Sequence, residues 1–66
     1  MNLMINGKQM ELTDGMSIAQ FLEEKSLHPR SVVVELNRVI IDRDKYSETV
    51  FNEGDEVEIV RFIGGG

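Results

Sequence analysis

The chain has 66 residues, with twelve acidic and seven basic side chains and a formal net charge of −5, which allows one small domain and no second one. It has no cysteine and one histidine, His28, so neither disulfides nor a zinc cluster can supply its stability. The basic residues are scattered and no aromatic residues form a stacking platform among them, so we expect no binding to nucleic acid. The sequence has no signal-peptide pattern and no long apolar run, so we expect a soluble cytoplasmic protein that does not bind membranes.

The first segment predicts a β-hairpin. Apolar and polar residues alternate on both sides of Asn6-Gly7, and this pair tolerates the positive φ of a two-residue hairpin turn. We expect strands over residues 2–6 and 9–12, and we assign Asn6-Gly7 no role beyond the turn.

The next segment predicts a helix of about two turns. Ser17 suits the N-cap position, Gln20 completes a capping box with it, and Met16 is placed to pack on Phe21. Pro29 disfavours helical geometry in the residue before it, so the helix should end near residue 25 or 26. One helical face is apolar and is expected to join the core: Ile18, Phe21 and Leu22.

The second half of the chain predicts three more strands. Residues 32–36 are mostly β-branched and indicate a buried central strand, Asn37-Arg38 indicates a tight turn, and residues 39–41 indicate a shorter strand. Residues 42–49 are polar and predict an irregular loop, which Tyr46 is expected to anchor. A turn over residues 52–55 then leads into a last strand over residues 56–62. The isolated polar side chains have no second catalytic element beside them and are assigned to caps or solvated surface: Glu23, Glu24, His28, Asp42 and Asp44.

The element order is therefore β-β-α-β-β-β. It is typical of an α+β domain in which one helix packs across one face of a mixed sheet of about five strands. The first and last strands can pair in parallel at the sheet centre, which would leave the C-terminal segment protruding from one end.

The last strand has two different faces. If Val57 and Ile59 point toward the helix, then Glu58, Val60 and Phe62 lie on the opposite face, which begins acidic and becomes apolar. In a sheet covered on one side only, that face is exposed and suits the docking of a partner protein. The alternative is that a bulge or a loop buries Phe62 in the core.

Three glycines, Gly64-Gly65-Gly66, end the sequence directly after this strand. They lack side chains and predict a flexible tail over residues 64–66, distinct from a folded domain over residues 1–63. Such a tail fits a narrow active site of another protein, so we take the carboxyl carbon of Gly66 as the candidate reactive atom.

The glycine tail, the strand order and the run GDEVEIV over residues 54–60 together resemble the ThiS family, the sulfur carriers of thiamine biosynthesis. The resemblance covers the whole chain, with further matching segments at residues 5–7, 15–18 and 36–37. Many family members end in two glycines, onto which Gly65 and Gly66 map, and Gly64 is either part of the motif or extra length. The family has the ubiquitin-like β-grasp fold.

The resemblance implies a carrier that partner enzymes modify, and not an enzyme or a protein with a bound cofactor. An E1-like adenylating enzyme would use ATP to convert the Gly66 carboxylate into an acyl-adenylate. A sulfur donor, such as a cysteine desulfurase, would then supply the sulfur of a thiocarboxylate, which thiazole synthase accepts. Two alternatives stay open: a sulfur carrier for molybdopterin, cysteine or tRNA thiolation, and a non-covalent ubiquitin-like interaction module.

Overall fold

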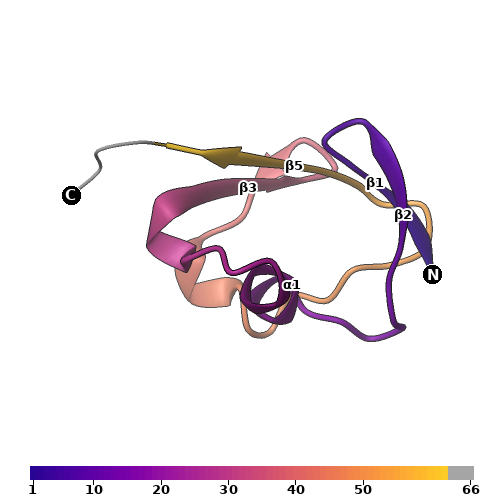
Figure 1. The fold of residues 1–66 in the computed structure, drawn as a ribbon, viewed down its shortest axis with the longest axis horizontal. Coiled ribbons are helices and arrows are strands. Elements are labelled where there is room, and N and C mark those ends of the chain that lie inside the picture. Colours follow the sequence, from indigo (N-terminus) through magenta and orange to yellow (C-terminus); the bar gives the residue numbers. More distant parts are fainter. Residues whose placement is uncertain (63–66) are drawn as a thin grey trace.

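The computed structural model describes residues 1–62 and has one helix on one side of a five-stranded sheet (Figure 1). The strands lie in the order β2-β1-β5-β3-β4, with β5 parallel to β1 and antiparallel to β3. This confirms the predicted β-grasp fold and the central parallel pair. The elements are β1 (Asn2–Ile5), β2 (Lys8–Glu11), α1 (Ile18–Glu24), β3 (Val32–Leu36), β4 (Val39–Ile40) and β5 (Glu56–Arg61), with short 3₁₀ turns at Pro29–Ser31 and Arg43–Lys45.

Two hairpins have turns with positive φ at both central residues. Asn6 and Gly7 have φ values of 52° and 79°, and Asn37 and Arg38 have φ values of 52° and 71°. This geometry matches the right-handed twist of the flanking strands, which explains why the sequence places asparagine first in both turns. The predicted hairpins are confirmed, with strand ends that differ from the prediction by about one residue.

Local hydrogen bonds fix both ends of α1. The amide of Gln20 donates to Ser17 Oγ at 3.1 Å, and the amide of Ser17 donates to Gln20 Oε1 at 2.8 Å, which confirms the capping box. At the other end Ser26 has a φ of 57°, and the amide of Leu27 donates to the carbonyl of Leu22 at 2.8 Å. The helix therefore ends where the sequence predicts.

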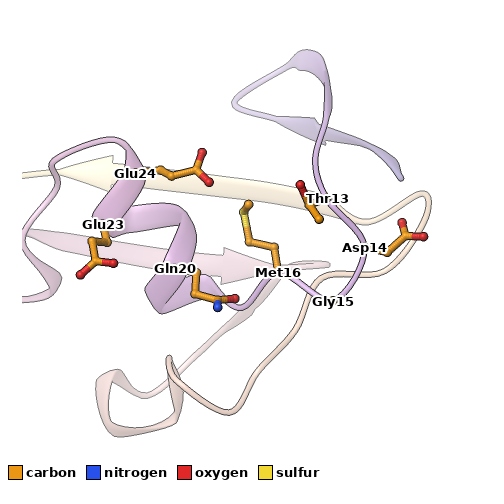
Figure 2. A pocket seen from close by; sticks show the side chains of 7 residues that line it. All are labelled: Thr13, Asp14, Gly15, Met16, Gln20, Glu23 and Glu24. Atoms are coloured by element: carbon orange, nitrogen blue, oxygen red, sulfur yellow. The ribbon is translucent and has the colours of Figure 1, made fainter.

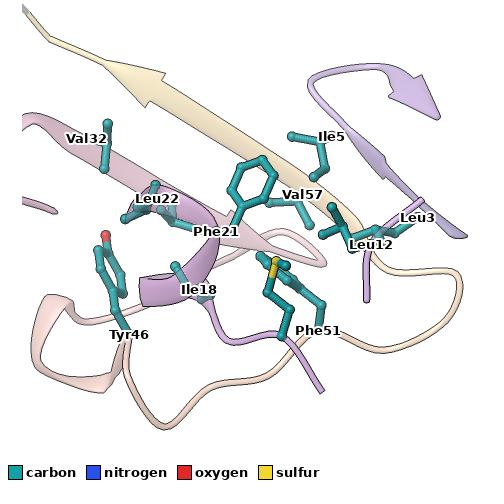
Figure 3. Close-up of a cluster of buried hydrophobic side chains, with 12 residues drawn as sticks. Leu3, Ile5, Leu12, Ile18, Phe21, Leu22, Val32, Tyr46, Phe51 and Val57 are labelled. Atoms are coloured by element: carbon teal, nitrogen blue, oxygen red, sulfur yellow. The ribbon is translucent and has the colours of Figure 1, made fainter. Parts of the chain in front are cut away.

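The core lies between α1 and the sheet (Figure 3). The aromatic rings of Phe21 and Phe51 pack edge to face, with centroids 6.0 Å apart. Tyr46 is buried and anchors the polar loop as predicted, whereas Phe51 joins the core from a segment that the sequence left unassigned. The buried apolar side chains are Leu3, Ile5, Leu12, Met16, Ile18, Phe21, Leu22, Val32, Val34, Tyr46, Phe51 and Val57.

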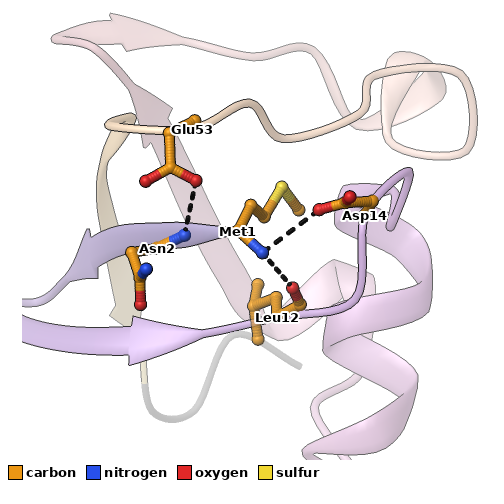
Figure 4. A network of polar contacts seen from close by, with 5 residues as sticks. All are labelled: Met1, Asn2, Leu12, Asp14 and Glu53. Atoms are coloured by element: carbon orange, nitrogen blue, oxygen red, sulfur yellow. Dashed lines mark hydrogen bonds and ion pairs between the residues drawn. The ribbon is translucent and has the colours of Figure 1, made fainter.

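Polar contacts hold the start of the chain in place on two sides (Figure 4). The amide of Asn2 donates to Glu53 Oε1 at 2.9 Å, and the amide of Gly54 donates to the Asn2 carbonyl at 2.8 Å. The amino group of Met1 donates to the Leu12 carbonyl at 2.8 Å and to Asp14 Oδ1 at 3.1 Å. The two contacts of Asn2 hold the start of β1 beside the turn that leads into β5, whereas the contacts of Met1 hold it beside the segment that follows β2.

Within residues 1–62, no helix is long and apolar enough to span a membrane.

Candidate functional site

The two faces of β5 differ in exposure as their sequence predicts. Val57 is fully buried and Ile59 is partly buried against the core, whereas Glu58 is exposed on the opposite face. Val60 is 56% exposed and Phe62 is 39% exposed. The alternative that Phe62 belongs to the core is therefore wrong, and both apolar side chains are available to a partner.

The strands beside β5 extend this surface. Val33 on β3 lies opposite Val60, and Met4 on β1 pairs with Glu56 and is 41% exposed. Side chains directly opposite each other in a sheet share a face, so these residues belong to the same surface as Glu58 and Val60. We call it the open face, the side of the sheet that α1 does not cover. It includes Ile40 on β4, which lies opposite Glu35 and is 64% exposed. Its residues on and beside β5 are Met4, Val33, Glu35, Glu56, Glu58, Val60 and Phe62. The alternation along β5 predicts the part on that strand, whereas only the strand register places Met4, Val33, Glu35 and Ile40 there.

The open face carries negative charge in its middle. Glu35 lies directly opposite Glu58, an arrangement of like charges that destabilises a sheet. One cation lies near, since Nε of Arg38 is 3.6 Å from Oε1 of Glu56, but both side chains are largely exposed and the pair contributes little. The face therefore combines apolar side chains near the end of β5 with carboxylates suited to a basic surface.

β5 ends at Arg61, beside the start of β3 (Figure 1). Within residues 1–62, the amide of Phe62 donates a hydrogen bond of 3.1 Å to the carbonyl of Ser31 at this end. The predicted tail, Gly64, Gly65 and Gly66, and the domain boundary after residue 63 lie outside the described residues.

Asn6 has a second role besides its place in the hairpin turn. Its backbone amide donates to the Val57 carbonyl at 2.9 Å, as a residue of β1 would. Its side chain then bonds both backbone groups of Ile59: the Ile59 amide donates to Asn6 Oδ1 at 2.7 Å, and Asn6 Nδ2 donates to the Ile59 carbonyl at 3.2 Å. We call this pair of bonds the Asn6 bridge. The prediction that Asn6-Gly7 is a turn and nothing more is therefore wrong.

The other polar candidates have structural roles. Nδ1 of His28 accepts a hydrogen bond of 3.1 Å from the amide of Arg30 and caps a 3₁₀ turn, as predicted. Glu23 and Glu24 line a surface hollow beside the loop that contains Asp14, and both are exposed (Figure 2). In residues 1–62 no three histidine or acidic side chains are grouped so that they could hold a metal ion.

Comparisons with known proteins agree on one family. The model of the ThiS family matches residues 3–66. The chain is 37% identical to the sulfur carrier protein ThiS of Bacillus subtilis, over 97% of this chain and 98% of that protein. It superposes with a TM-score of 0.77 on the crystal structure of the thiamine biosynthesis protein ThiS from Geobacter metallireducens, at 34% identity and with both chains fully covered.

Two further relatives are longer proteins. Over its whole length the chain is 39% identical to a thiazole synthase of Paramagnetospirillum magneticum, of which it spans 20%. A thiazole synthase of Magnetococcus marinus is 33% identical and is likewise spanned over 20% of its length. On the evidence of its sequence over residues 3–66 and of its β-grasp fold, the chain belongs to the ThiS family of sulfur carrier proteins.

Proposed function

We propose that this chain carries sulfur for thiamine biosynthesis as a thiocarboxylate on Gly66. The observation that carries the proposal is the family match over residues 3–66, which includes the glycines that follow the central strand. Partner enzymes then bind the folded domain, and the reacting atom is the carboxyl carbon of Gly66.

The chemistry requires activation because a carboxylate is a poor electrophile. A carboxylate oxygen of Gly66 attacks the α-phosphorus of ATP, which releases pyrophosphate and leaves an acyl-adenylate. When the sulfur nucleophile is sulfide, it attacks the carboxyl carbon, AMP leaves, and a thiocarboxylate remains. When it is the persulfide of a cysteine desulfurase, its outer sulfur attacks, AMP leaves, and a thiol reductant must then cleave the S–S bond of the acyl disulfide to leave the thiocarboxylate. An E1-like adenylating enzyme and a sulfur donor such as a cysteine desulfurase supply these steps, so the chain is a co-substrate and binds no cofactor of its own.

Thiazole synthase is the proposed acceptor of the sulfur. A segment similar to this entire chain makes up one fifth of two proteins that carry that name. A domain of this kind is thus joined covalently to the rest of those proteins, which supports a functional pairing. Docking raises the effective concentration of the thiocarboxylate at the acceptor in the same way that a covalent link does.

The open face is the proposed docking surface for these partners. Val60 and Phe62 supply apolar contact next to the tail, and Glu58 supplies charge that favours a basic partner. The placement suits the chemistry, because a protein held at Phe62 is only a few residues from Gly66.

Intact mass tests the proposal. The chain is incubated with ATP, the adenylating enzyme of its own organism and a sulfur source, and a gain of about sixteen daltons is expected because sulfur replaces oxygen. A reaction without ATP is the control, since the acyl-adenylate cannot form there. Addition of thiazole synthase and its substrates should return the mass to that of the carboxylate. An unchanged mass in the complete reaction contradicts the carrier function, and a gain that thiazole synthase does not reverse assigns the sulfur to another pathway.

A further inference from the structure

Asn6-Gly7 combines a chemically reactive sequence with a side chain that is held at two atoms. Asparagine is among the thermolabile residues, and a following glycine makes it more reactive because no side chain shields the backbone nitrogen that attacks it. The chain has four asparagines, and only Asn6 precedes a glycine. A Cβ placed on Gly7 would meet no atom within 4 Å, so no neighbouring segment of residues 1–62 crowds this turn.

Deamidation at such a pair proceeds through a ring. The backbone nitrogen of Gly7 gives its proton to hydroxide and attacks Cγ of Asn6. The bond from Cγ to Nδ2 breaks, and the leaving nitrogen takes a proton from water and departs as ammonia. Water then opens the succinimide ring at either carbonyl, which leaves aspartate or isoaspartate at position 6. One water is consumed and one ammonia is released, so the mass rises by about one dalton.

The Asn6 bridge opposes the first step of this reaction. The Ile59 amide donates to Asn6 Oδ1 at 2.7 Å, and Asn6 Nδ2 donates to the Ile59 carbonyl at 3.2 Å, so both polar atoms of the reacting group are bonded to β5. Attack by Gly7 makes the planar Cγ tetrahedral and expels Nδ2, so both bonds must open before the ring closes. Asn6 is exposed and lies beyond the described pairing of β1 with β5, so the bridge can open without unfolding of the core.

We propose that Asn6 is the deamidation site of this chain and that opening of the Asn6 bridge controls the rate. Neither product restores the bridge. Aspartate at position 6 keeps the acceptor for the Ile59 amide but has no hydrogen for the Ile59 carbonyl. Isoaspartate runs the backbone through the former side chain and lengthens the turn. The modification therefore removes contacts from β5 directly before Val60 of the open face, and the inference holds whatever the function of the chain.

Asn37 provides a matched comparison within the same chain. It also has a φ of 52° at the first position of a hairpin turn. Its side chain is held in a similar way, since Nδ2 donates to Asp55 Oδ1 at 3.0 Å and the Glu56 amide donates to Asn37 Oδ1 at 2.9 Å. The next residue is Arg38, whose side chain hinders attack by its own backbone nitrogen. Asn37 should therefore stay intact while Asn6 reacts, even in the unfolded chain.

Peptide mass spectrometry measures the rate at each asparagine. The full chain is incubated in mildly alkaline buffer, both folded and unfolded by guanidinium chloride. We expect Asn6 to react first in both states, and about tenfold or more slowly in the folded chain because two hydrogen bonds must open. Earlier reaction at another asparagine in either state overturns the assignment of the site. Equal rates at Asn6 in the two states overturn the control by the bridge.

Amide hydrogen exchange at Ile59 gives a second test, because this amide donates to Asn6 Oδ1 and exchanges when the bridge opens. The factor by which folding slows deamidation of Asn6 should match, within about threefold, the factor by which it slows exchange of the Ile59 amide. Guanidinium chloride below the unfolding transition should raise both rates together. A strongly protected Ile59 amide beside a rapidly deamidating Asn6 would show ring closure without opening of the bridge, and would overturn the inference.

Discussion

Asn6 illustrates, at the scale of single residues, how one side chain serves both local and distant structure. Its φ of 52° suits the hairpin turn, and its amide bonds Ile59, which is 53 positions away in the sequence. The first role is local, so the Asn-Gly pattern predicts it. The second role depends on the register of β5 beside β1, which no local pattern contains. The capping box of Ser17 and Gln20 could be predicted because its partners are three positions apart.

The Asn6 bridge should contribute measurably to stability. Asn6→Gly keeps a residue that tolerates positive φ and removes both bonds to Ile59, so we expect unfolding in urea to show a loss of about 1–2 kcal/mol. Asn6→Asp is the matched control, because aspartate also tolerates this φ and keeps the acceptor for the Ile59 amide. Its loss should be smaller, and equal losses would mean that the acceptor bond contributes nothing.

Substitution of Phe62 tests the proposed docking surface. Phe62→Asp places a charge on an exposed apolar site, so we expect a stable fold and a rise in the KM of adenylation of about tenfold or more. Val50→Asp is the control, because Val50 is 44% exposed but pairs with Ser17 at the start of α1 and not with the open face. Equal effects of the two substitutions would remove the reason to place docking at Phe62.

At the scale of elements, the pairing of β3 with β5 opposes stability to the proposed docking role of Glu58. The opposite pair Glu35 and Glu58 repels across the open face. Sequence periodicity placed Glu58 on that face but could not identify its partner, because the pairing of two strands separated by a long connection is a tertiary property.

Glu58→Lys should therefore act in opposite directions on folding and on docking. Replacing repulsion with attraction should raise the free energy of unfolding by about 0.5 kcal/mol, while the reversed charge should weaken binding to a basic partner. Urea unfolding and the KM of adenylation measure the two effects. Glu23→Lys makes the same change of charge at an exposed position of α1, on the other side of the sheet, and should leave the KM of adenylation nearly unchanged. A Glu58→Lys variant that is more stable and equally well adenylated would exclude Glu58 from the docking surface.

At the scale of the whole molecule, the fold was predictable because a local sequence pattern marks each helix and strand. Only a few arrangements of these elements bury all their apolar faces. The capping box fixes the helix, two asparagine-led turns fix the hairpins, and the alternation in β5 orients the sheet. The central parallel pair was a possibility that the sequence could not decide. Bonds between distant segments decide it, among them those of Asn2 with Glu53 and Gly54.

The residues that form the core and the residue proposed to react lie in different parts of the chain. Every buried apolar side chain of the described part lies between Leu3 and Val57, so a chain that ends at Phe62 keeps this core. We expect its urea midpoint to equal that of the full chain, and we expect no mass gain with the adenylating enzyme, ATP and a sulfur source. Because it keeps the open face, it should compete with the full chain for the adenylating enzyme, and the same truncated chain with Phe62→Asp should compete about tenfold less well. Absence of competition by the folded truncated chain would mean that the enzyme recognises the tail alone, and the open face would then lose its assigned role.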